Sequence, residues 1–287
     1  MESIVVRMGI LSCLKSKSEN GKTVGIMITA SHNPEEDNGI KICDSNGDMI
    51  DDKWEKYATT LVNIPEEQVL PYIKEIVERE RLNISVKSNV ALGYDTRKSS
   101  IPLSMICIKG IPHCTANLHN FGLVTTPQLH YLVHRMNLHG TAMPKDYSDH
   151  FIKAFKDMKE FFINKEAIKI TVDAANGVGA SQLALFKRGL EDLIDFTVVN
   201  DGKGLLNHGV LLVLMFSVEQ ISSKSIKDPL KIFLLIPTID LLPWMEMLIV
   251  CSISSLAMRN LSFWMVTKLL LYLPLFFRSS LVKLAWT

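Results

Sequence analysis

Residues 23–34, with the sequence TVGIMITASHNP, decide the fold, because an apolar run ends there in a short polar segment. Residues 23–29 are apolar and rich in β-branched side chains over the length of one strand, which predicts a buried strand. This strand leads into residues 30–34, where asparagine and proline favour a loop. Ligands commonly bind at the carboxyl ends of strands in α/β proteins, so this loop is the first candidate site.

Strands and helices are expected to alternate on both sides of this stretch. Short apolar runs predict strands, and apolar residues at helical spacing predict helices. The expected strands are residues 40–43, 89–94 and 167–172, and the expected helices are residues 7–15, 53–64, 66–81 and 147–162. This alternation predicts an α/β fold with polar loops at the strand ends.

The chemically richest segment is residues 29–41, TASHNPEEDNGIK. Ser31 offers a hydroxyl group beside the imidazole of His32, and an exposed serine can act as a nucleophile or phosphate carrier. Lys41 follows closely and could neutralise the charge of a phosphate or a sugar oxyanion. Taken alone, the Ser-His-Asn sequence is better explained as an ordinary turn with a capping serine.

The complete segment is similar to the phosphoserine loop of the α-D-phosphohexomutases. The acidic insert at residues 35–37 resembles the phosphoacetylglucosamine branch of that family. The resemblance implies that Ser31 carries the phosphate that is given to the sugar and taken back. It also implies that His32 and Lys41 orient this phosphate and assist proton transfer. The remaining substrate or phosphate ligands implied by it are Asn33, Asn38 and Arg97.

Other segments follow the order of the family. Residues 95–100, DTRKSS, resemble its Gly-Arg-Asp-Thr-Arg-Pro-Ser-Ser loop, although Tyr94 stands where an arginine is usual. Arg97 could instead be one half of a surface ion pair, which is common and energetically minor. Residues 121–130, FGLVTTPQLH, match a first-domain segment of the acetylglucosamine branch, and His130 on its own is more often a hydrogen-bonded structural histidine.

The resemblance divides the chain into three parts. Residues 1–146 correspond to a first domain of mixed sheet and covering helices that lacks the family's opening segment. Residues 147–210 begin a similar second domain, and residues 172–180, VDAANGVGA, resemble its opening. Residues 101–120 do not align with the family. The family's third and fourth domains, which read the sugar and bind its phosphate, are absent from the sequence.

The reaction implied is the interconversion of N-acetylglucosamine 6-phosphate and 1-phosphate through a 1,6-bisphosphate, in the synthesis of UDP-N-acetylglucosamine. A phosphoglucomutase or phosphomannomutase and a non-catalytic fragment are the alternatives. The family uses Mg²⁺, held by three aspartates of an Asp-Gly-Asp-Ala-Asp-Arg loop and by the serine phosphate, here on Ser31. This string does not occur in the sequence. We therefore expect the chain as written to be inactive and its Mg²⁺ binding to be impaired.

Residues 211–287 form a tail in which acidic residues are rare and large apolar residues dominate. Codons for residues 244–250, WMEMLIV, permit Asp-Gly-Asp-Ala-Asp-Arg when they are read from the third base of the first codon. Residues 212–216 and 263–268 permit two further family segments in the same frame. We interpret the tail as a frame slip after residue 210. Membrane insertion is the alternative, but charged residues and prolines interrupt the apolar runs.

Composition limits the partners and the compartment. The formal net charge of +1 gives no sign of nucleic-acid binding, and the expected partner is a small phosphosugar. The cysteines have no metal-binding spacing and are expected to be free thiols in a reducing compartment. They are Cys13, Cys43, Cys107, Cys114 and Cys251. The chain starts without a basic segment before an apolar run, so a cytoplasmic location is expected.

Overall fold

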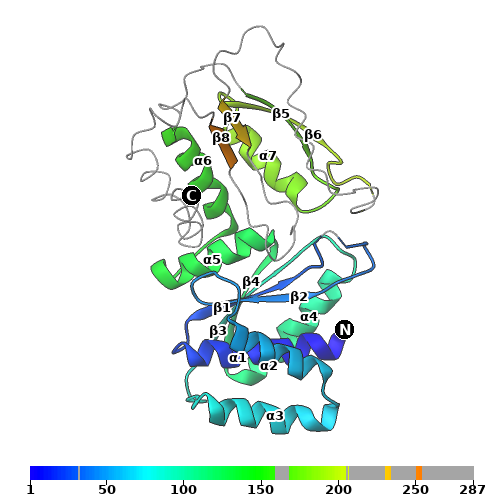
Figure 1. Ribbon diagram of the computed structural model, residues 1–287, viewed down its shortest axis with the longest axis vertical. Helices are drawn as coiled ribbons and strands as arrows, with labels where there is room; N and C mark the ends of the chain where they lie inside the picture. The colour runs from blue at the N-terminus through cyan, green and yellow to red at the C-terminus, as the bar shows by residue number, and fades with distance from the viewer. Residues whose placement is uncertain (32, 159–167, 205, 207–229, 234–249, 254–287) are drawn as a thin grey trace.

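The protein is described from a computed structural model (Figure 1), which covers residues 1–31, 33–158, 168–204, 206, 230–233 and 250–253. His32 lies outside these residues. Most of the tail at residues 211–287 also lies outside them, so the structure does not test the frame-slip interpretation. Within the tail the structure describes a short antiparallel pair, β7 (Leu230–Phe233) and β8 (Val250–Ile253). In the described part of the chain, no helix is both long and apolar enough to cross a membrane.

A four-stranded mixed sheet forms the centre of the amino-terminal part. The strands are β1 (Thr23–Ile28), β2 (Ile40–Cys43), β3 (Ser88–Tyr94) and β4 (Ala116–Leu123), in the order β2-β1-β3-β4. β1 runs antiparallel to β2 and parallel to β3, and β3 runs parallel to β4. The sheet confirms the expected α/β class with a mixed first-domain sheet.

Helices cover both faces of this sheet (Figure 1). They are α1 (Glu2–Ser18), α2 (Asp52–Asn63), α4 (Ser100–Gly110) and α5 (Thr126–His139), and α3 (Glu66–Arg79) packs outside α1 and α2. Alternate residues of β1 separate the two faces: Ile26 packs with residues of α1 and α4, whereas Met27 packs with residues of α5. All six residues of β1 are therefore buried, which explains why its sequence is apolar throughout.

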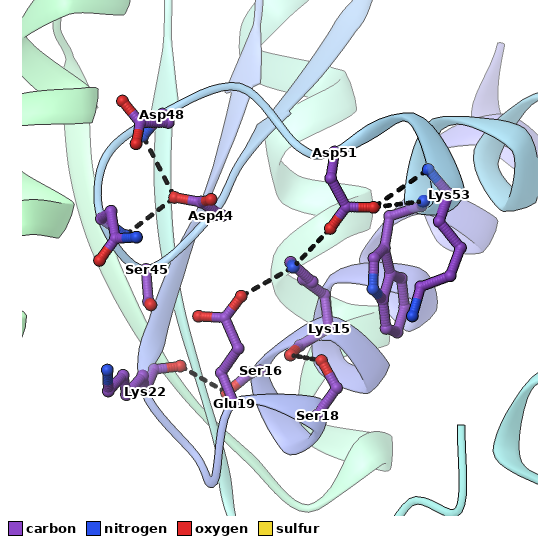
Figure 2. A network of polar contacts seen from close by, with 12 residues as sticks. Lys15, Ser16, Ser18, Glu19, Lys22, Asp44, Ser45, Asp48, Asp51 and Lys53 are labelled. Atoms are coloured by element: carbon purple, nitrogen blue, oxygen red, sulfur yellow. Dashed lines mark hydrogen bonds and ion pairs between the residues drawn. The ribbon is translucent and has the colours of Figure 1, made fainter. Parts of the chain in front are cut away.

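A polar network joins the end of α1 to the start of α2 (Figure 2). Asp51 caps α2 by accepting hydrogen bonds from the backbone N–H groups of Lys53 and Trp54, at 3.0 and 3.1 Å. The ammonium of Lys15 pairs with Glu19 at 2.7 Å and with Asp51 at 3.2 Å, and it lies 5.4 Å from the centre of the Trp54 ring. The buried lysine is thus fully compensated by charge and by an aromatic face.

The second part of the chain has its own sheet and its own core. It contains α6 (Pro144–Met158), β5 (Ile168–Asp173), α7 (Gly179–Gly189) and β6 (Ile194–Val199), and β5 runs parallel to β6. Leu183, Phe186 and Phe196 belong to a hydrophobic cluster that is separate from those around the first sheet. Gln128 on α5 donates to Gln182 on α7 at 2.7 Å and links the two parts.

The expected elements are present, with different bounds at several ends. The first helix begins at Glu2 and ends at Ser18, so it is longer than the predicted 7–15 segment. The helix predicted at residues 147–162 begins at Pro144, and its last residues lie outside the described ranges. Residues 101–120 contain most of α4, the short 3-10 helix η1 (Ile111–Cys114) and much of β4.

Candidate active site

The β1–β2 hairpin brings Ser31 and Lys41 together. β1 ends at Ile28, the chain loops out, and β2 returns antiparallel, with Lys41 opposite Met27 in the register. The backbone N–H of Thr29 donates to the carbonyl oxygen of Gly39 at 3.0 Å and closes the base of the loop. Across this loop the ammonium of Lys41 donates to the hydroxyl oxygen of Ser31 at 3.2 Å. The two residues that sequence analysis singled out as phosphate carrier and cation are therefore in direct contact.

Ser31 adopts an uncommon backbone conformation. Its φ is +55°, in the left-handed region that most side chains avoid. Its backbone N–H donates to the hydroxyl oxygen of Thr29 at 3.2 Å, and the N–H of Asn33 donates to the carbonyl oxygen of Ala30 at 3.0 Å. Such conformations persist where surrounding contacts enforce them, and they concentrate at functional sites.

Asp95 is the centre of a buried network beneath this loop. It follows β3, which lies beside β1, and its backbone N–H donates to the carbonyl oxygen of Ile28 at 3.1 Å. Its carboxylate accepts hydrogen bonds from the hydroxyl groups of Thr29, at 2.7 Å, and Ser100, at 2.5 Å. Because the Thr29 hydroxyl also accepts from the N–H of Ser31, Asp95 is connected to the serine through a single side chain.

Arg97 holds the serine loop by its backbone. One terminal nitrogen, Nη2, donates to the carbonyl oxygens of Ser31 and Asn33, both at 2.9 Å, and Nη1 pairs with the Asp95 carboxylate. The residue is only 2% exposed, so it is not a surface ion pair. Its Nε is buried and makes no hydrogen bond within the described residues. The phosphate-binding role expected of Arg97 stays a prediction.

The two predicted asparagine ligands lie in the same loop. The side-chain amide of Asn38 donates to the hydroxyls of Ser99, at 2.9 Å, and Ser100, at 3.0 Å. Asn33 donates to the carboxylate of Asp37 at 3.4 Å. Asn38 thus ties the serine loop to the segment that carries Arg97, and its predicted contact with substrate remains untested. His32, the other predicted catalytic residue, lies outside the described residues.

The described residues do not by themselves make up a magnesium site. No group of three or more histidine, cysteine, aspartate or glutamate side chains within them is arranged to hold a metal ion. Near the candidate nucleophile, Asp95 is already committed to Thr29, Arg97 and Ser100. The expectation that a phosphate on Ser31 would be a magnesium ligand stays a prediction.

His130 has a structural role, as expected for an isolated histidine. It lies on α5, and its Nδ1 is 2.7 Å from the carbonyl oxygen of Gly47. Gly47 has a φ of +82°, and a Cβ atom there would lie 2.5 Å from the carbonyl oxygen of His130. The contact fixes the turn after β2 against α5 and involves none of the candidate site residues.

Sequence reasoning identified Ser31, Lys41 and Arg97 but did not assign Asp95 and Thr29 their positions at the centre of the network. The signal that could have indicated Asp95 is its place directly after a predicted strand. Its connection to Ser31 through Thr29 could not be inferred, because the local sequence pattern does not indicate that β3 lies beside β1.

Comparison with known families identifies the fold of the amino-terminal part. Residues 10–69 and 63–145 match the family model described as phosphoglucomutase/phosphomannomutase, alpha/beta/alpha domain I. The second match includes residues 101–120, so the expectation that this segment does not align with the family is wrong. The phosphoacetylglucosamine mutase of Homo sapiens is 38% identical over 214 residues, which is 72% of this chain and 39% of that protein. The mouse enzyme is 40% identical over 218 residues, with the same coverage. The chain therefore spans about two fifths of the length of the relatives that it matches.

Solved structures give the same result. A crystal structure of N-acetylglucosamine-phosphate mutase in its substrate complex superposes with a TM-score of 0.67 at 41% identity, over 72% of this chain and 40% of that one. The N-acetylphosphoglucosamine mutase of Aspergillus fumigatus, in complex with GlcNAc-6P and magnesium, gives 0.63 at 34% identity, over 70% and 38%. By sequence and by fold, the amino-terminal part of this chain belongs to the α-D-phosphohexomutase superfamily and is homologous to the amino-terminal part of the phosphoacetylglucosamine mutases.

Proposed function

We propose that Ser31 is the phosphate relay of a phosphoacetylglucosamine mutase, which interconverts N-acetylglucosamine 6-phosphate and 1-phosphate. The observation that carries this proposal is the 3.2 Å contact between the Lys41 ammonium and the Ser31 hydroxyl oxygen. A phosphorylated serine carries between one and two negative charges at neutral pH, and a lysine at this distance compensates them. The named relatives and the complex with GlcNAc-6P support the choice of sugar.

The reaction is a pair of opposite phosphoryl transfers. In the first, the bond between phosphorus and the Ser31 oxygen breaks while phosphorus bonds to the free sugar hydroxyl, whose proton leaves. In the second, the other phosphate of the resulting 1,6-bisphosphate returns to Ser31. Lys41 would stabilise the negative charge that develops on the serine oxygen as it leaves, which is electrostatic stabilisation at a preorganised site. The roles of His32 in proton transfer, and of Asn33, Asn38 and Arg97 as ligands, are part of the proposal.

The hydrogen bonds that support the loop position Ser31 for phosphoryl transfer. Arg97 and Asp95 fix the backbone of Ser31, so the reacting oxygen is presented in a single geometry. Small displacements of a reacting atom reduce rates strongly, so holding the serine loop in place lowers the activation free energy of phosphoryl transfer. The buried network is therefore assigned to positioning rather than to the chemical step.

Several features belong to the longer enzyme. We place the magnesium requirement, the sugar-reading domain and the role in UDP-N-acetylglucosamine synthesis with a full-length, cytoplasmic protein. A division of the chain near residue 146 is supported by the end of the family match at residue 145 and by the separate hydrophobic cluster that follows. The chain as written is proposed to be inactive, because the aspartate loop is not in its sequence.

Two enzymes test the proposal: this chain and a version in which the reading frame is restored after codon 210. The restored enzyme should show Mg²⁺-dependent mutase activity and carry phosphate on the tryptic peptide spanning residues 23–41, whereas this chain should show no turnover. Ser31→Ala should abolish both signals, and Ser18→Ala on α1 should change neither. Undiminished turnover in Ser31→Ala would disprove the relay.

Sequencing the transcript tests the frame slip. A transcript that matches this protein without a break across codon 210 would show that the tail is genuine.

A further inference from the structure

Three free cysteines gather on one side of the first sheet. Cys13 on α1 and Cys107 on α4 are buried in the same hydrophobic cluster, and Cys114, at the end of η1, packs against it. Cys13 and Cys107 are 0% and 1% exposed, whereas Cys114 is only partly buried. Two of the three, Cys107 and Cys114, lie in the segment between β3 and β4.

Hydrogen bonds from Ser88 bring the backbones around Cys13 and Cys114 together. Ser88 is the first residue of β3 and is fully buried. Its hydroxyl donates to the carbonyl oxygen of Cys13 at 2.9 Å, and its backbone N–H donates to the carbonyl oxygen of Thr115 at 3.2 Å. A single residue thus binds α1 at Cys13 and the chain immediately after Cys114.

The cysteine side chains of α1 and α4 also lie close together. A Cβ atom on Gly9 of α1 would lie 3.8 Å from the sulfur of Cys107, so this face of α1 is directed at α4. Cys13 is one helical turn further along that face, where the chain of α4 continues into η1 and Cys114. The thiols of Cys13 and Cys114 are near enough for each to shift the pKa of the other.

The two thiols differ in acidity. The hydrogen bond from Cys13 and the ammonium of Lys17 together lower the pKa of Cys114 to about 7, although partial burial opposes them. The pKa of Cys13 is raised, because its proton is held in that hydrogen bond and its side chain is buried. Lys17 is fixed by donating to the carbonyl oxygens of Ile84, at 3.2 Å, and Val86. A partly exposed, acidic thiol beside a protonated thiol is the arrangement of an attacking and a resolving cysteine.

We propose that Cys114 and Cys13 are an oxidation site that hydroperoxides convert to an intramolecular disulfide. The Cys114 thiolate attacks one oxygen of hydrogen peroxide, the O–O bond breaks, and sulfenic acid and hydroxide form. The sulfur of Cys13 then attacks the sulfenic sulfur, and the hydroxyl group leaves as water with the Cys13 proton. The two sulfur atoms are oxidised by two electrons in total and one peroxide is reduced. The bond would join α1 to the turn before β4, behind the sheet that carries Ser31.

Peptide mapping tests the proposal on the full chain, because trypsin separates all four relevant cysteines. Cys13 falls in the peptide of residues 8–15, Cys43 in 42–53, Cys107 in 99–109 and Cys114 in 110–135. The purified chain is treated with hydrogen peroxide, alkylated without reductant and digested. We expect peptides 8–15 and 110–135 to appear joined, two hydrogen atoms lighter than their sum, and to separate on reduction.

Two variants and one rate measurement complete the test. Cys114→Ser should abolish the linked pair, whereas Cys43→Ser, which removes a buried thiol of β2, should leave it unchanged. In the unmodified chain, iodoacetamide labelling of peptide 110–135 should rise to half its maximal rate near pH 7, and this result does not depend on any variant folding. A link between peptides 8–15 and 99–109 instead, or irreversible oxidation of Cys114 with Cys13 still free, would overturn the proposal.

Discussion

Arg97 donates two hydrogen bonds from one nitrogen into the serine loop, and the bond to the carbonyl oxygen of Ser31 spans 66 residues of sequence. The same guanidinium pairs with Asp95, which is itself connected to Ser31 through Thr29. The serine backbone is therefore held at both its N–H and its carbonyl by a single buried ion pair. This double attachment accounts for the left-handed conformation of Ser31, which isolated residues avoid.

Removing the guanidinium should cost stability as well as activity. Arg97→Met leaves the Asp95 carboxylate buried without its countercharge, and breaking such a pair from one side costs about 3–5 kcal/mol. Urea unfolding of the chain measures this loss. Arg135→Met is the matched control, because its pair with Asp146 is partly exposed and should be worth less than about 1 kcal/mol. Equal losses in the two variants would show that the Arg97 pair does not support the loop.

Lys41→Met should separate catalysis from folding. The ammonium contacts the Ser31 oxygen from a strand whose backbone pairing does not depend on the side chain. In the frame-restored enzyme we expect kcat to fall by roughly 10²–10³, the usual effect of removing one stabilising donor, with little change in the unfolding midpoint. Lys22→Met, which changes an exposed lysine just before β1, serves as the control. Unchanged kcat in Lys41→Met would remove this lysine from the mechanism.

The sequence singled out Ser31 and Lys41 as candidate site residues of one segment but did not reveal the network below them, for a physical reason. Those two residues lie on one hairpin, and the apolar runs at 23–29 and 40–43 are enough to place them together. Asp95 and Arg97 reach the serine only because β3 lies next to β1, and local patterns do not encode the order of strands. The burial of Arg97 was hidden for the same reason, since its exposure depends on the loop folded over it.

The helix α4 illustrates a second limit. Its sequence, SIPLSMICIKG, is apolar with no clear helical or alternating period. Periodicity separates the faces of an element only when one face is polar, so a short apolar run can be a strand or a buried helix. Leu103 and Cys107 pack into the core, while Ile101 and Met105 are exposed, at 53% and 55%.

Two left-handed glycines allow a test of the turn that His130 holds. Gly47→Ala places a Cβ atom 2.5 Å from a backbone oxygen, whereas Gly140→Ala, at a φ of +77°, meets nothing within 4 Å. Both variants incur the cost of a left-handed alanine, about 1–2 kcal/mol. Gly47→Ala should lose clearly more, because the His130 backbone must also move. Thermal unfolding compares the two, and equal shifts in Tm would mean that the turn yields without cost.

Asp51 combines a helix cap with an ion pair, and two substitutions separate them. Asp51→Ala removes both and should cost about 1 kcal/mol or more, whereas Asp51→Asn keeps an amide oxygen that can cap α2.

Burial acts to raise the pKa of Asp51, but hydrogen bonds from the Trp54 N–H and from Lys15 outweigh it and lower the pKa overall. The folded state therefore releases this proton more readily than the unfolded chain. The contribution of the ionised carboxylate, from its capping hydrogen bonds and its ion pair together, is fully present above pH of about 4 and is lost as the pH falls through the lower folded pKa. The stability difference between wild type and Asp51→Asn, measured by urea unfolding, should thus shrink from pH 7 to pH 3. Asp52→Asn, an exposed neighbour, controls for the general loss of a negative charge at the start of α2. A difference that stays constant between the two pH values would show that the charge of Asp51 does not contribute to stability.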